Sequence, residues 1–199
     1  MANELDRPDP SPYIHNLGAS DAVHREAAAW SLGEIGSPRA ARPLAGLLLR
    51  EMQAVERSGV FAHSAVVRAV AVAIRRIGAQ EALYAVLKAL CVLSRARAVD
   101  DETVKDLVET LAEVGGPGAV REAADKVVDG ARRNRPAPGL EAVGAILLER
   151  LGLCGDAAQA TLRRVAETGP APLRPLARRY SAARDSTASS DSFFSSPGL

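Results

Sequence analysis

The amino-acid sequence predicts an all-α protein, and three observations support this prediction. Ala is the most frequent of the 199 residues, with 38 occurrences, and it has the highest helix propensity. Only seven residues are aromatic, fewer than small β-rich chains usually contain. Apolar residues recur at helical spacing, in runs that end at Gly or Pro. With 47% hydrophobic residues, the chain can form one ordinary core or a short array of repeats.

The first helical run carries a start signal and a stop signal. Asp21 precedes it and is a favourable N-cap, because its side chain can accept a hydrogen bond from a free N–H of the first turn. Ala28, Leu32 and Ile35 follow at steps of four and three, which places them on one helical face. Gly36 is predicted to end the helix in the left-handed conformation.

A second helix is predicted to begin at Ser37 and Pro38, since Pro suits the first helical position, and to run to about Val55. Its predicted core face consists of Ala40, Leu44, Leu47 and Leu48. The same helix pair then recurs, with predicted core positions at Val70, Ile74, Ala82, Leu107 and Leu111. An apolar residue followed by Gly marks the equivalent point of each copy, at Ile35–Gly36, Ile77–Gly78, Val114–Gly115 and Leu151–Gly152.

These points are 42, 37 and 37 residues apart, and such a period with two helices per unit predicts a right-handed α-solenoid of about four helix pairs. The predicted organisation is an irregular lead-in (1–20), a repeat domain (21–185) and a disordered, Ser-rich tail (186–199). Within the domain, the repeats cover about 21–56, 62–97, 100–133 and 139–168, and a cap helix covers 172–184.

The segment 23–50 resembles a HEAT repeat of the short bacterial type that also occurs in phycobilisome lyases. The residues that carry this resemblance are Arg25, Ala28, Leu32, Gly33, Ile35, Gly36, Ala40 and Leu44. The resemblance covers about 15–185, although later copies have Val67 and Val104 where the first has Arg25. It implies a solenoid fold and leaves function open, since HEAT-like arrays serve many tasks.

No catalytic, metal or cofactor motif stands out. His15, His24 and His63 lack the spacing of a metal site, and Cys91 and Cys154 are expected to be small buried hydrophobic residues rather than a disulfide or ligands. The run 115–118 is expected to be a turn, and Trp30 to pack against the adjacent repeat. With neither a secretory signal nor a membrane-spanning run expected, the predicted location is cytoplasmic.

Charge is segregated along the chain although the net charge is only +1. Residues 1–38 sum to −4, 39–98 to +7, 99–130 to −6 and 131–185 to +5. One interpretation is complementarity between neighbouring repeats in the stack. The other is a banded surface that binds a partner of opposite pattern.

The predicted function is a non-enzymatic scaffold or adaptor that binds another protein along the concave face, which the second helix of each pair lines in HEAT arrays. The alternatives are a bilin-lyase-like or chaperone-like factor that assists modification of a partner, and nucleic-acid binding through 39–98, against which the low net charge argues. The candidate partner-binding residues are Arg39, Arg42, Arg50, Tyr84, Lys88, Arg95, Arg121 and Asp125. Phe193 and Phe194 form a candidate docking motif in the tail.

Overall fold

The computed structural model describes residues 8–133, 137–155 and 158–191, and within these the fold is all-α, with nine α-helices, three short 3₁₀ helices and no strand. The 3₁₀ helices are Pro38–Ala40, Gln80–Ala82 and Ala171–Leu173. The α-helices are α1 (Ser11–Asn16), α2 (Ala22–Ile35), α3 (Ala41–Ser58), α4 (Ser64–Ile77), α5 (Leu83–Leu93), α6 (Asp101–Arg133), α7 (Pro138–Gly152), α8 (Gln159–Thr168) and α9 (Arg174–Asp191).

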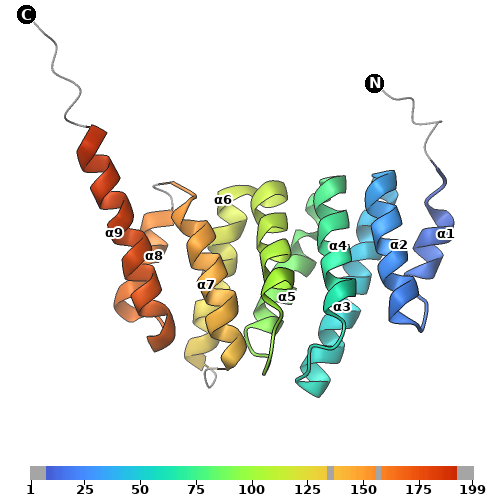
Figure 1. Ribbon diagram of the computed structural model, residues 1–199, viewed down its shortest axis with the longest axis horizontal. Helices are drawn as coiled ribbons and strands as arrows, with labels where there is room; N and C mark the ends of the chain where they lie inside the picture. Colours follow the sequence, from blue (N-terminus) through green and yellow to red (C-terminus); the bar gives the residue numbers. More distant parts are fainter. Residues whose placement is uncertain (1–7, 134–136, 156–157, 192–199) are drawn as a thin grey trace, which may run out of the picture.

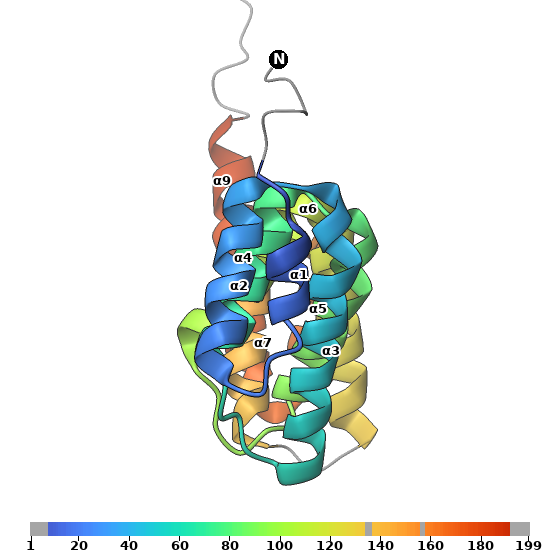
Figure 2. The ribbon, with the colours of Figure 1, turned by 90° about the vertical axis from the view of Figure 1, so that its right-hand side faces the viewer.

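The helices lie in two rows, each helix roughly upright and beside its neighbour (Figures 1 and 2). The first row contains α2, α4, the first half of α6, α7 and α9. The second row contains α3, α5, the second half of α6 and α8. Contacts connect successive helices within a row, and between the rows they connect α3 to α4, α5 to α6 and α8 to α9. None of the described helices is both long and apolar enough to cross a membrane.

A kink divides α6 between the two rows. Gly116 has φ 69° and ψ −172°, outside the helical region, and Pro117 follows it. The predicted turn at 115–118 is therefore present as a reversal within one long helical segment, with 101–115 in the first row and 117–133 in the second.

The predicted helix ends are confirmed in the first pair. The Asp21 carboxylate accepts a hydrogen bond from the Val23 N–H at 2.9 Å, which satisfies one of the free donors of the first turn. Gly36 closes α2 with φ 65°, and Gly78 closes α4 with φ 70°. This left-handed conformation is easily reached without a Cβ, so glycine stands at the same point of both pairs.

The core lies between the two rows, and most of the predicted core positions are buried. Leu32, Leu44 and Ile74 have no exposed surface, whereas Ile35, at the end of α2, is half-buried. Burying each such side chain stabilises the fold by about 1.5–3 kcal/mol. Small residues let α2 and α4 approach closely: a Cβ added at Gly33 would lie 3.0 Å from the Ala73 Cα.

Two predictions about the ends of the chain are wrong. The lead-in contains α1, because the Asp9 carboxylate accepts hydrogen bonds from the Ser11 N–H and hydroxyl and so supports the helix start. Its C-cap, Leu17, is buried in the core. At the other end α9 continues to Asp191, beyond the predicted limit of 184, since no Gly or Pro interrupts that stretch and extending a formed helix costs little. Phe193 and Phe194 lie outside the described residues.

Candidate partner-binding face

The outward side of the second row is the face on which partner-binding residues were predicted, and it is called the second-row face here. Arg39 lies in the 3₁₀ helix before α3, and Arg42 and Arg50 lie on α3. Tyr84 and Lys88 lie on α5, with Arg95 directly after it. Arg121 and Asp125 lie on the second half of α6. All eight residues therefore belong to second-row segments.

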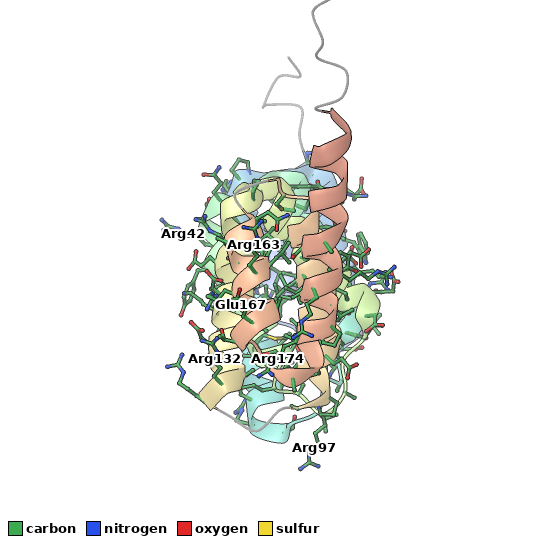
Figure 3. All side chains as sticks on the ribbon, turned by 90° about the vertical axis from the view of Figure 1, so that its left-hand side faces the viewer. Arg42, Arg97, Arg132, Arg163, Glu167 and Arg174 are labelled. Carbon is green, nitrogen blue, oxygen red and sulfur yellow. The ribbon has the colours of Figure 1, made fainter. Side chains whose placement is uncertain are left out.

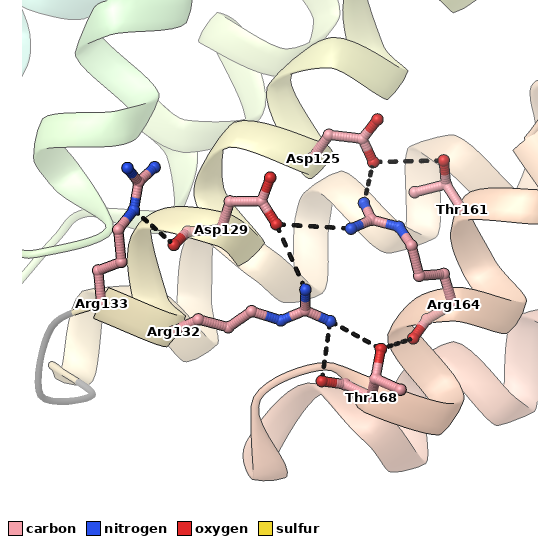
Figure 4. A network of polar contacts seen from close by, with 7 residues as sticks. All are labelled: Asp125, Asp129, Arg132, Arg133, Thr161, Arg164 and Thr168. Carbon is pink, nitrogen blue, oxygen red and sulfur yellow. Dashed lines mark hydrogen bonds and ion pairs between the residues drawn. The ribbon is translucent and has the colours of Figure 1, made fainter.

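Four of these eight side chains make hydrogen bonds or ion pairs with other residues of the chain. Arg50 Nη2 donates to the Leu17 carbonyl oxygen at 2.9 Å and so ties α3 to the N-terminal helix. Lys88 and Arg95 both form ion pairs with the Glu56 carboxylate of α3. Asp125 accepts hydrogen bonds from Arg164 and, at 3.3 Å, from the Thr161 hydroxyl (Figure 4).

The other four are exposed. Arg42 points away from the body of the molecule (Figure 3), and Tyr84 is 68% exposed. Within the described residues, Arg42, Tyr84 and Arg121 make no hydrogen bond or ion pair with another side chain. Arg39 lies in the electrostatic range of Asp9, whose pKa is lowered mainly by hydrogen bonds from Ser11 and slightly by Arg39.

A groove opens on this face between the C-terminal ends of α3 and α5. Its volume is about 460 Å³, within the range of ligand-sized clefts. Its apolar lining is Val55, Val92 and Ala96, and its polar lining is Glu56 and Arg95. Gly59, the left-handed residue after α3, completes the wall without a side chain.

The polar edge of the groove carries more positive than negative charge. Lys88 Nζ lies 3.0 Å and Arg95 Nη2 3.2 Å from the same atom, Oε1 of Glu56. Two cations therefore share one carboxylate. Burial raises the pKa of the nearby Cys91 thiol, and the positive charges of Arg95 and Lys88 oppose that rise.

The charge blocks of the sequence are explained by contacts between neighbouring helix pairs. In the first row, Glu34 of the acidic block 1–38 pairs with Arg76, and Asp106 of the block 99–130 pairs with Arg68 at 3.2 Å. On the other side of the same acidic block, Glu109 pairs with Arg150 at 3.1 Å. These ion pairs support the interpretation that the charge blocks are complementary between neighbouring helices.

The second row shows the same complementarity between the block 99–130 and the block 131–185. Arg164 of α8 contacts both Asp125 and Asp129 of α6 (Figure 4). Arg132 Nη2 donates to the Thr168 carbonyl oxygen at 3.0 Å and to its hydroxyl at 2.7 Å. These contacts join α6 to α8 along one side, so the acidic half of the predicted surface is largely used within the fold.

Sequence reasoning missed a buried polar cluster in the first pair. Arg25 is 9% and Glu51 7% exposed, and Arg25 Nε and Nη2 each lie 3.0 Å from Glu51 Oε1. Arg25 Nη1 also donates to the carbonyl oxygens of Ala19 and Ser20, at 3.0 and 2.7 Å. His63 Nδ1 lies 2.7 Å from the second oxygen, Oε2, of Glu51. The cluster holds α2, α3 and the start of α4 together.

The remaining candidates from the sequence are placed as follows. Trp30 meets the neighbouring pair through Arg76, whose guanidinium carbon lies 5.8 Å from the ring centroid, and it stays 38% exposed. Cys91 and Cys154 are half-buried against the core and are not bonded to each other. Among the described residues, no group of three or more His, Cys, Asp or Glu side chains is placed to hold a metal ion.

Comparison with known proteins adds no family to these observations. No protein-family model matches the chain, and no curated protein matches it. The fold places the chain in the class of all-α proteins, and its described helices lie in two rows.

Proposed function

We propose that this chain is a HEAT-like, right-handed α-solenoid that acts as a non-enzymatic scaffold and binds a partner protein along its second-row face. The order of helix contacts supports the solenoid interpretation. Each helix pair packs mainly on the pairs before and after it, which is how repeat arrays bury their apolar sides.

The groove between α3 and α5 carries the functional proposal. It opens between two helices of the second row, and Arg95, one of the predicted residues, forms part of its wall. Arg42 and Tyr84 are exposed at the N-terminal ends of these two helices, away from the groove, and they extend the candidate surface along the second row. Exposed Tyr and Arg side chains are typical of the residues that dominate protein–protein binding energy.

A photo-crosslinking experiment tests this proposal in cells. Tyr84 is replaced by p-benzoylphenylalanine, and a matched control carries the same amino acid in place of Val23, which is 67% exposed on α2 in the first row. We expect one protein to be linked covalently from position 84 and not from position 23. Crosslinking from position 23 alone, or from neither position, would refute binding through the second-row face.

A further inference from the structure

The charge and shape of the α3–α5 groove indicate what kind of partner segment it fits. Its floor is apolar, since Val55, Val92 and Ala96 line it and are themselves at most 5% exposed. A floor of this kind gives a partner's aliphatic or aromatic side chain a place to leave water. The apolar part of a ligand would therefore enter between the two helix ends.

The charged edge of the groove selects for a negative group. Glu56 is the only acidic residue among those described that line the groove, and it already receives both Lys88 and Arg95 on one oxygen. A lysine ammonium has three N–H donors and an arginine guanidinium has five, so most of their donors remain available. A second carboxylate would therefore balance a local excess of positive charge.

A further cation borders the opposite wall. Arg97 Nε lies 3.9 Å from where a Cβ would stand at Gly59, and the Arg97 side chain is exposed and extends from the end of the molecule (Figure 3). Arg97 and Arg95 thus flank the apolar floor from the segment that follows α5. Cations on both sides of one cleft favour an acidic chain lying across it.

We infer that the groove binds an acidic linear segment of another protein, in which a carboxylate side chain neighbours an apolar one. The apolar side chain contacts Val55, Val92 and Ala96, and the carboxylate contacts Arg95 and Lys88. This inference rests on the proposed scaffold function and adds the chemistry of the partner. Opposite charge also accelerates encounter and makes binding weaken as salt concentration rises.

The test uses a display library of random linear peptides, selected on the immobilised full-length chain. A selected peptide is synthesised with a fluorophore, and its dissociation constant is measured by fluorescence anisotropy. We expect the selected sequences to share an Asp or Glu beside an aliphatic or aromatic residue. Selection of basic sequences that bind this groove would overturn the inference.

Three variants then locate the peptide and fix the sign of the charge effect. Arg95→Glu should weaken binding by about tenfold or more, as the loss of a central charged contact does. Glu56→Gln should tighten binding several-fold, because Lys88 and Arg95 lose the carboxylate that competes with the peptide. Arg179→Glu, an exposed change on α9, should leave the dissociation constant unchanged. Weaker binding in Glu56→Gln would overturn the inference.

Both groove side chains are more than a third exposed, 45% for Arg95 and 37% for Glu56, so these variants should fold, and melting curves check this. A single-stranded oligonucleotide can compete for the same cations. If it binds more tightly than the peptide and loses affinity in Arg95→Glu, the groove binds nucleic acid and the acidic-segment inference is overturned. If no peptide binds the groove while position 84 still crosslinks a partner, the acidic-segment inference fails and the scaffold proposal stands. If no peptide binds the groove and position 84 crosslinks no partner, both the acidic-segment inference and the scaffold proposal are refuted.

Discussion

The buried pair of Arg25 and Glu51 gives the sharpest prediction about stability. We expect Glu51→Ala to lower the free energy of unfolding by about 3–5 kcal/mol, because removing one partner leaves the other charge buried and uncompensated. Only 11% of the Arg25 side chain and 8% of the Glu51 side chain are exposed, so water can replace little of the lost contact. Arg25 would keep only its two backbone acceptors, the carbonyl oxygens of Ala19 and Ser20.

A double-mutant cycle separates this explanation from a simple loss of packing. Arg25→Met alone should also be strongly destabilising, since it leaves the Glu51 carboxylate with His63 alone. The double variant Arg25→Met/Glu51→Ala removes both charges and should lose less stability than the two single variants together. The interaction energy between the two sites is the quantity that the cycle measures.

The measurement is urea unfolding followed by far-ultraviolet circular dichroism, with linear extrapolation to water. Glu122→Ala serves as the control, because Glu122 pairs with Lys126 at 3.1 Å but their side chains are 58% and 50% exposed. That variant should lose less than about 1 kcal/mol. Equal losses in Glu51→Ala and Glu122→Ala, or strict additivity in the cycle, would refute the assignment of a buried, coupled pair.

Three further predictions concern packing, close approach and capping. Leu32→Ala should cost about 2–5 kcal/mol in urea unfolding, since the side chain is fully buried; a loss under about 0.5 kcal/mol would mean that the core register is wrong. Gly139→Ala should cost about 3 kcal/mol, because a Cβ there would lie 2.1 Å from a backbone carbonyl oxygen of α5, whereas Gly46→Ala, with no atom within 4 Å, should stabilise α3 by about 0.5–1 kcal/mol. Asp100→Ala should cost about 1 kcal/mol near neutral pH, because Asp100 caps the first turn of α6. Hydrogen bonds from the Thr103 hydroxyl and N–H lower the pKa of Asp100. The ionised Asp100 therefore stabilises the fold above the ordinary carboxyl pKa, and this stabilisation is lost as pH falls through the lowered pKa. The difference in unfolding free energy between Asp100→Ala and the parent should shrink at acid pH.

Much of the helical framework could be predicted because its signals are local. Asp21 and Gly36 act within one turn of the helix they bound, and the apolar spacing of Leu32 or Leu44 depends only on the period of the helix. Such signals need no knowledge of the neighbouring helix. The same locality explains the error at α1, because a six-residue helix that begins with Pro10 and Pro12 carries too few residues to show a period.

Contacts between helices could not be predicted in the same way. Arg25 and Glu51 are 26 residues apart, and nothing in either helix alone identifies the other as its partner. The requirement for glycine at position 139 also comes from another helix. A Cβ at Gly139 would collide with the carbonyl oxygen of Leu93 at the end of α5. The apolar spacing predicts that Arg50 lies on the second helix, but its hydrogen bond to the Leu17 carbonyl oxygen depends on α1, which the spacing does not predict.

The charge blocks connect the fold to the proposed partner. Where an acidic block lies beside a basic one, ion pairs such as Arg68–Asp106 and Arg164–Asp125 join the two blocks, so part of the alternating charge is paired within the fold. At the α3–α5 contact, by contrast, the helices of two basic pairs meet, and Glu56 is the single described carboxylate that receives Lys88 and Arg95. Block 39–98 spans two successive helix pairs, so its excess of cations cannot be neutralised between them. The positive charge that remains is therefore set by the stacking order of the pairs, and it falls at the groove where we infer that an acidic segment binds.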